Sequence, residues 1–255
     1  MILTGADFLI DGGATASYFY GPLNPNKKMK RPYIVCHMVA SIDGRIDCSM
    51  VDKISGDEYY ETLEKLDCPT LLEGRVTMQH YNAAKEPFVA NDPTPFGMTS
   101  VYKAVDSDEY MVAVDTHGKL RWPASEIDGV PLVCIVSEQV PQEYLEMLRN
   151  EGISYICTGK DAIDLPAAME ILCSEFGVER MAILGGGHIN GGFLAAGLID
   201  EVSLLLAPGI DGRKGQTALF DGIPDMNRMP VRLSLESVEK IENDILWIRY
   251  KPTGK

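Results

Sequence analysis

The sequence predicts an α/β protein with a mainly parallel sheet, flanked by helices and extended by antiparallel strands at its C-terminal edge. Between residues 33 and 198, short apolar runs alternate with segments of helical periodicity, which is typical of βαβ units. After residue 200, three strand-like runs follow one another without a helix, which favours hairpins. With 255 residues, 45% of them hydrophobic and 24% charged, the chain can bury a large core without disulfide or metal support.

Residues 1–30 are expected to form an N-terminal arm. They mix Gly, Pro, Asn and aromatic residues and end in a basic run before Pro32. The main domain should therefore comprise residues 31–255. The opening segment lacks the basic flank and unbroken apolar stretch of a signal peptide, and no later stretch reaches the length of a membrane span. We therefore expect a cytoplasmic protein that does not associate with membranes.

Apolar runs and turn residues mark the expected elements of the domain in order. Strands are predicted where apolar runs lie between turn residues, at 33–40, 69–73, 110–115, 131–136, 154–158, 180–184, 201–208, 231–241 and 245–252. Helices are predicted from a capping box at Ser55 and Glu58, from Gly74, over 141–152 and 164–177, and from the glycine run at 185–192 to Leu198. A loop rich in Pro, Asn and Gly is expected at 86–99, and loops of that length often carry function.

Charge and motif spacing exclude several classes of function. The 23 Lys and Arg against 37 Asp and Glu give a net charge of −14, so the field of the molecule repels nucleic acids and anionic membranes. Six cysteines form no CxxC pair, and four histidines lie at no metal-ligand spacing, so reduced thiols and no metal are expected. Nucleophile-elbow, P-loop and zinc-deaminase motifs are absent from the sequence. Cofactor chemistry on a small molecule remains.

The strongest signal for a ligand is the strand at 180–184 that runs into GGGHINGG and a helix. Glycine lets backbone N–H groups approach an anion closely, and the helix dipole favours its negative charge, so a phosphate or pyrophosphate is the natural occupant. This is not the Rossmann fingerprint, because Asn190 stands where the third glycine is required. The alternatives are a tight turn that needs glycine only for packing, and a structural role for His188.

Gly74, Arg75 and Thr77 mark a second strand-to-helix junction. The Arg75 guanidinium can pair with a phosphate, and the Thr77 hydroxyl can donate at the start of the helix. The alternative for Arg75 is an ordinary solvated surface charge. Because the carboxyl ends of parallel strands meet at one edge of a sheet, a ligand with several phosphates can span both junctions.

Polar residues also follow the first predicted strand, in ASIDGRID. Ala40 is small enough for backbone contact with a ligand, and Ser41 and Arg45 are candidate substrate-binding residues. Asp43 is the candidate catalytic residue, for orienting or protonating the substrate. The alternative for this segment is a plain turn.

Three blocks of the chain resemble one known family. RPYIVCHMVASIDGRI, CPTLLEGRVTM and VERMAILGGGHINGGFLAAGLIDEVSLLLAPGIDG are similar, in order and spacing, to the reductase domain of riboflavin biosynthesis, the C-terminal half of the bifunctional deaminase-reductase. The resemblance covers about residues 31–250. It implies a dihydrofolate reductase-like fold, NADPH-dependent reduction of the ribosyl group of a ribosylaminopyrimidine 5′-phosphate, and a homodimer.

The resemblance also implies which residues contact NADPH. Ala40 precedes the S-x-D-G turn, Thr116 stands where the family has a Ser or Thr near the cofactor, and the glycine turn holds the pyrophosphate. Gly74, Arg75 and Thr77 are similar to the G-R-x-T of dihydrofolate reductases. The implied cofactor-binding set is Ala40, Gly74, Arg75, Thr77, Thr116, Gly185, Gly186, Gly187, His188 and Ile189.

The chain departs from the family on the substrate side. A glutamate often precedes the glycine turn in these reductases, whereas Leu184 stands here, and Tyr81 lies where an Asp is typical. The deaminase half is absent. Two alternatives therefore stay open: a dihydrofolate reductase-like enzyme acting on another small molecule, and a sensor that binds NADPH without turnover.

Overall fold

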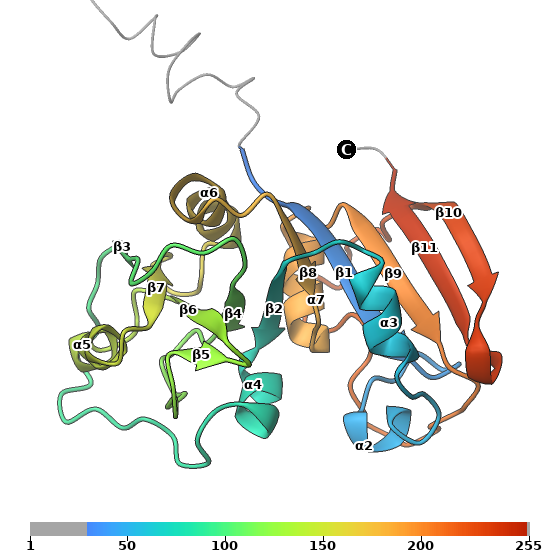
Figure 1. Ribbon diagram of the computed structural model, residues 1–255, viewed down its shortest axis with the longest axis horizontal. Coiled ribbons are helices and arrows are strands. Elements are labelled where there is room, and N and C mark those ends of the chain that lie inside the picture. The colour runs from blue at the N-terminus through green and yellow to red at the C-terminus, as the bar shows by residue number, and fades with distance from the viewer. Residues whose placement is uncertain (1–29, 254–255) are drawn as a thin grey trace, which may run out of the picture. The chain divides into compact units, whose positions relative to one another are not determined.

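The computed structural model describes residues 30–253, and the chain divides into two compact units, Met1–Lys30 and Arg31–Lys255. The expected arm lies outside the described residues, apart from Lys30. The second unit is an 11-stranded sheet with helices on both faces (Figure 1). No helix in residues 30–253 is long and apolar enough to cross a membrane.

The centre of the sheet is parallel, as predicted. Its strand order is β10-β11-β9-β1-β8-β2-β4-β6-β7-β3, with β5 beside β6. The strands that pair in parallel are β1 (Tyr33–Ala40), β2 (Thr70–Gly74), β4 (Met111–Val114), β6 (Val130–Val136), β7 (Ser154–Cys157), β8 (Arg180–Ile183) and β9 (Glu201–Leu206). The antiparallel strands are β3 (Ser100–Tyr102), β5 (Glu126–Ile127), β10 (Leu233–Lys240) and β11 (Leu246–Pro252).

The predicted antiparallel C-terminal edge is confirmed for β10 and β11, which form a hairpin beside β9. The strand β9 belongs to this antiparallel edge through its pairing with β11, and on its other side it pairs in parallel with β1. The reason is that a helix precedes β9 and returns the chain across the sheet, as in the other crossovers. The strands β3 and β5 were not predicted, since two or three residues carry too little periodicity.

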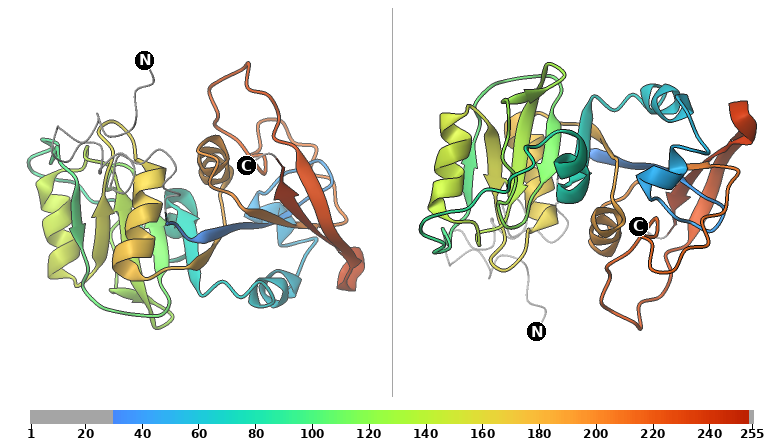
Figure 2. Two further views of the ribbon diagram at one scale, coloured as in Figure 1. Left: turned by 90° about the horizontal axis from the view of Figure 1, so that it is seen from above. Right: turned by 90° about the horizontal axis from the view of Figure 1, so that it is seen from below.

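Helices cover the two faces of the sheet (Figure 2). Their bounds are α2 (Cys48–Val51), α3 (Glu58–Glu64), α4 (Arg75–Tyr81), α5 (Gln142–Asn150), α6 (Leu165–Phe176) and α7 (Gly187–Ala195), with a 3-10 turn at Glu242–Asp244. Alternate strand residues assign the faces: Val112 of β4 packs in the core that includes Leu172 of α6, whereas Ala113 packs with Tyr144 of α5. Thus α6 and α7 lie on one face and α3, α4 and α5 on the other.

The structure confirms one predicted helix cap and contradicts another. Asp164 caps α6, accepting a 3.0 Å hydrogen bond from the Ala167 N–H, as an N-terminal cap should. The predicted capping box before α3 is wrong. Ser55 donates instead to the Val51 carbonyl at the end of α2 (2.9 Å), and α3 begins only at Glu58.

The loop at 86–99 contains no helix or strand, and hydrogen bonds hold it to the rest of the domain at several points. The Phe88 N–H donates to the Lys119 carbonyl, and the Phe96 N–H donates to the Val140 carbonyl, both at 2.8 Å. The carboxylate of Glu143 on α5 accepts from further N–H groups of the loop. The loop is therefore held against the ends of β4 and β6.

Candidate functional site

The strands β1 and β8 separate at their carboxyl ends. β1 pairs with β8 only as far as Cys36 and Ile183, but it pairs with β9 as far as Ala40 and Leu206. Among residues 30–253, the last residues of β1 therefore have no partner strand on the side that faces β8. In parallel sheets, such an opening at the carboxyl edge is where ligands bind. Ala40, which is 1% exposed, ends β1 at this opening.

The turn after β8 leaves backbone donors free at the same edge. Gly185 has a φ of 98°, a conformation that favours glycine, and its carbonyl accepts a 2.9 Å hydrogen bond from the Gly74 N–H. Gly186 is the residue before α7, and no side chain caps this helix. A Cβ atom built on Gly186 would meet nothing within 4 Å. Uncapped N–H groups beside open space suit an anionic group.

Other glycines of the run serve packing. A Cβ on Gly187 would lie 2.2 Å from the Ala218 carbonyl oxygen, and one on Gly191 would lie 1.9 Å from that of Asp221. The Asp221 N–H also donates to the Gly187 carbonyl at 3.0 Å. His188 is exposed, and its ring packs against Gly222. The packing interpretation therefore holds for Gly187 and Gly191, whereas Gly186 faces open space, and anion binding there stays a prediction.

The junction after β2 lies directly beside this turn. A Cβ on Gly74 would be 2.6 Å from Cγ1 of Ile189, so glycine is required for α7 to approach β2. Arg75 is exposed and makes no hydrogen bond or ion pair with any residue in 30–253. Thr77 is half-buried in the first turn of α4, which also lacks a side-chain cap. The structure therefore brings Gly74, Arg75 and Thr77 to the same edge as the glycine turn.

Thr116 follows β4 farther along this edge. The Thr116 carbonyl accepts two hydrogen bonds from Ser137, one from its N–H group (3.2 Å) and one from its hydroxyl group (2.6 Å). These bonds fix the backbone at Thr116. The neighbouring Asp115 is fully buried, and its Oδ2 accepts from the Lys119 and Leu120 N–H groups and from the Tyr144 hydroxyl. Thr116 thus lies on a rigid turn.

The loop after β1 uses its polar groups internally. The Asp43 carboxylate accepts from the Ser41 hydroxyl (2.7 Å) and from the N–H groups of Asp211 and Gly212 (both 3.0 Å). These bonds hold the pKa of Asp43 well below its usual range, the bond from Ser41 contributing most. Arg45 donates to the Gln216 carbonyl at 2.6 Å. These contacts favour a turn-forming role for Ser41, Asp43 and Arg45 over substrate binding and proton donation.

Glu73 is a candidate that the sequence analysis missed. It lies in β2 immediately before Gly74, and its Oε2 is buried without a hydrogen-bond partner among the described residues. Desolvation raises the pKa of this carboxyl group to about 7. The signal in the sequence was an acidic residue at the end of an apolar strand run.

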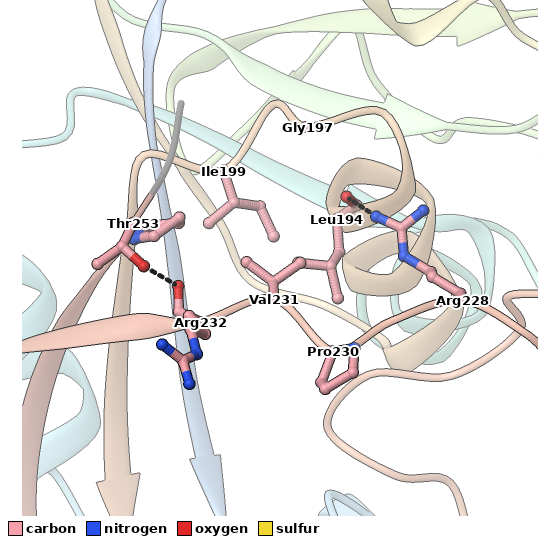
Figure 3. Close-up of a pocket in the computed structure, with 9 residues that line it drawn as sticks. Leu194, Gly197, Ile199, Arg228, Pro230, Val231, Arg232 and Thr253 are labelled. Atoms are coloured by element: carbon pink, nitrogen blue, oxygen red, sulfur yellow. Dashed lines mark hydrogen bonds between the residues drawn. The ribbon is translucent and has the colours of Figure 1, made fainter.

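Two surface pockets lie away from the glycine turn. A pocket of about 520 Å³ lies at the C-terminal end of α7, where Arg228 donates to the Leu194 carbonyl at 3.0 Å (Figure 3). A second, of about 510 Å³, lies between the 86–99 loop and the ends of β4 and β6, close to Thr116; among its lining residues are Phe88, Val89, His117, Lys119, Gln139 and Pro141. Within residues 30–253, no cluster of three or more His, Cys, Asp or Glu side chains could hold a metal ion.

Known proteins share this sequence pattern and fold. A 2,5-diamino-6-ribosylamino-4(3H)-pyrimidinone 5′-phosphate reductase from Methanothermobacter thermautotrophicus is 28% identical over 231 residues, covering 88% of this chain and 100% of that protein. A protein of the same name from Aquifex aeolicus is 22% identical over 195 residues, covering 76% and 84%. The crystal structure of a pyrimidine reductase-like protein from Corynebacterium diphtheriae superposes with a TM-score of 0.67 at 17% identity, covering 94% of this chain and 99% of that one, and so shows the shared fold.

The family assignment rests on the sequence as a whole. Residues 32–247 match the family described as the RibD C-terminal domain. This span begins with β1 and continues into β11, so it contains the glycine turn, the junction after β2 and the opening between β1 and β8. The chain therefore belongs to the RibD C-terminal domain family.

Proposed function

We propose that this protein is an NADPH-dependent reductase that converts the ribosyl group of a ribosylaminopyrimidine 5′-phosphate to a ribityl group in riboflavin biosynthesis. Relatives that match most of the chain are named as pyrimidinone 5′-phosphate reductases. The observation that carries the proposal is the edge where β1 and β8 separate beside the open Gly186 and the uncapped start of α7. It combines an opening for a ring with donors for phosphates.

The residues at this edge fit a nicotinamide dinucleotide. The first N–H groups of α7, at Gly187, His188 and Ile189, would hold the pyrophosphate, with Gly185 and Gly186 leaving room for it. The unpaired edge of β1 at Ala40 would hold the nicotinamide, while Gly74, Thr77 and Thr116 would line the rest of the cofactor. Bound NADPH supplies the hydride, and the protein supplies position and electrostatics.

The preference for NADPH over NADH is assigned to Arg75. Its guanidinium is exposed, unpaired within the described chain and adjacent to Gly74. A planar guanidinium can bind a 2′-phosphate through two hydrogen bonds. The net charge of −14 makes such a local cation necessary for any anionic ligand.

The same proposal covers the partners and the setting of the protein. The substrate is a small phosphorylated molecule, and neither nucleic acid nor membrane is a partner. All six cysteines are free, which is consistent with the reducing cytoplasm. We place the function in residues 31–255 and treat residues 1–30 as a separate arm.

We also propose a homodimer. The hairpin at the C-terminal edge exposes apolar side chains, with Leu233 42%, Leu235 54% and Val238 54% exposed. An edge strand with exposed apolar residues is a natural surface for pairing with a second copy. Light scattering at micromolar concentration should give twice the chain mass of 28.0 kDa, and a monomer mass would contradict the dimer.

The activity is tested by following the absorbance of NADPH with the aminopyrimidinone ribosyl phosphate, and in parallel with dihydrofolate, pterins and simple carbonyl compounds. Oxidation of NADPH that depends on the pyrimidine substrate is the expected result. Turnover of another compound alone would favour a reductase of a different small molecule. Tight NADPH binding without turnover of any compound would favour a sensor.

A further inference from the structure

We propose that Glu73 is a substrate-recognition residue, whose carboxyl group accepts a hydrogen bond from an N–H group of the aminopyrimidine ring. The inference rests on the proposed function and names a contact on the substrate side. The loop after β1 does not offer such a contact, because Asp43 and Arg45 are engaged with the chain itself.

Glu73 lies at the edge that carries the rest of the site. It is the residue before Gly74, whose N–H is bonded to the Gly185 carbonyl, and it pairs in register with Ala113 of β4. Ala113 packs on the face covered by α5, so Glu73 points to the face of α3, α4 and α5. On the other side of β2, the Leu184 N–H is bonded to the Leu72 carbonyl. Leu184 brings no polar side chain to this position.

The carboxyl group of Glu73 lacks a partner. Its Oε2 atom is fully buried, whereas its Oε1 atom is not. Neither oxygen has a hydrogen-bond partner within residues 30–253. An unpaired buried acceptor costs free energy, and folded proteins keep such groups where a ligand or another role accounts for them. A bound N–H donor would satisfy this carboxyl group.

Tyr59 of α3 lies near Glu73, and no cation of the described chain pairs with the Glu73 carboxyl group. Burial raises the pKa of Tyr59 well above its ordinary value, and the nearby Glu73 carboxyl raises it further, with smaller effects from Cys36, Tyr60 and Cys48. Tyr60 is 65% exposed. No charged side chain of residues 30–253 thus neutralises Glu73, and Tyr59 gives it one aromatic neighbour.

The substrate class follows from this chemistry. A partly buried, unpaired carboxyl acceptor selects a ligand that carries N–H donors, such as an amino-substituted heterocycle. The compound named for the relatives is a diaminopyrimidinone with two ring amino groups and a ring N–H. A carboxylate accepts from such groups more strongly than a neutral amide does, because the hydrogen bond is charge-assisted.

The test compares Glu73→Gln with Glu151→Gln. Glu151 also has a pKa raised by desolvation, but it ends α5 and lies away from the β1–β8 opening, so it is a matched control. We expect Glu73→Gln to raise the calorimetric Kd of the aminopyrimidinone ribosyl phosphate at least tenfold, with the Kd of NADPH and the melting temperature unchanged. Glu151→Gln should leave all three values unchanged. A Kd for Glu73→Gln within twofold of wild type would overturn the proposal.

The pH dependence of substrate binding gives a second readout. With a pKa of about 7, Glu73 is protonated in acid and loses its capacity as a charged acceptor. Wild-type affinity should therefore fall as the pH drops from about 8 to about 6, and the fall should be smaller in Glu73→Gln, where only the substrate phosphate still titrates in this range. A flat wild-type profile would contradict the role of Glu73.

The two proposals fail in different ways. A wild-type protein that binds the compound but does not oxidise NADPH contradicts the reductase activity. The substrate Kd of Glu73→Gln relative to wild type then still tests the contact with Glu73. Turnover that is equal in wild type and Glu73→Gln at sub-saturating substrate overturns the contact and leaves the reductase standing. A wild-type protein that does not bind the compound overturns both.

Discussion

The loop after β1 and the turn after β8 lie at the same edge of the sheet, yet they use their polar groups in opposite ways. In the first, Asp43 accepts three hydrogen bonds and Arg45 donates to a distant carbonyl. In the second, Gly186 faces open space and α7 begins without a cap. The difference teaches that polar residues near a site often stabilise its loops, whereas the groups left unpaired are those available to a ligand.

The largest effect should come from a glycine that serves packing. Gly187→Ala would place a methyl group 2.2 Å from the Ala218 carbonyl oxygen, which is backbone and cannot move away cheaply. We expect a loss of roughly 3 kcal/mol of stability, typical of severe overpacking. For a domain of this size, that lowers the melting temperature by about 6–12 °C. An unchanged melting temperature would show that the backbone at Ala218 does not pack tightly against the start of α7.

Gly186→Ala should separate binding from stability. Gly186 has a φ of −76°, which alanine adopts readily, and its Cβ would meet no atom of the protein within 4 Å. We expect a melting temperature within about 2 °C of wild type. The affinity for NADPH should fall at least tenfold, about 1.4 kcal/mol, because the methyl group would occupy the space assigned to the pyrophosphate.

Fluorescence titration with NADPH and thermal unfolding of the ligand-free protein measure the two quantities for this pair of glycines. Native NADPH affinity in Gly186→Ala would remove the cofactor assignment at this turn. A large drop in its melting temperature would instead make Gly186 resemble Gly187.

A smaller effect is expected at Arg75, which is exposed and therefore screened by solvent. Arg75→Ala should weaken NADPH binding about fivefold, roughly 1 kcal/mol, and leave NADH binding unchanged. The control is Arg228→Ala, an exposed arginine at the far end of α7. If the ratio of the two cofactor affinities stays the same in Arg75→Ala, the assignment of the 2′-phosphate to this residue is wrong.

The smallest effect should come from Asp43→Asn, because this carboxylate is solvent-accessible. The folded pKa of Asp43 lies below its unfolded value, so the ionised side chain stabilises the fold above about pH 4 and this contribution is lost as the pH falls further. Asp43→Asn should therefore lower the melting temperature slightly at pH 7, and the difference from wild type should shrink below pH 4. Loss of turnover at pH 7 without loss of stability would instead restore Asp43 as a catalytic residue.

The fold was largely predictable, and the exceptions have local causes. Long periodic segments such as β1, β6 and α6 occur where apolar spacing and caps place them. The antiparallel place of β9 beside β11 was predicted, whereas its parallel pairing with β1 depends on the crossover through α7 rather than on its own residues. The capping box at Ser55 failed because the Ser55 hydroxyl donates to the carbonyl of Val51, the last residue of the four-residue helix α2.

By itself, the sequence determined that strands and helices alternate, that glycines and an arginine follow two of the strands, and that three blocks resemble one family. Only the tertiary structure decided which of those groups are free. Asp43 is satisfied by residues 168 and 169 positions away, and Arg45 by one 171 positions away. Likewise, Glu73 is unpaired because no donor of the described chain reaches it. Hydrogen-bond partners so distant along the chain are set by packing, which local spacing cannot encode.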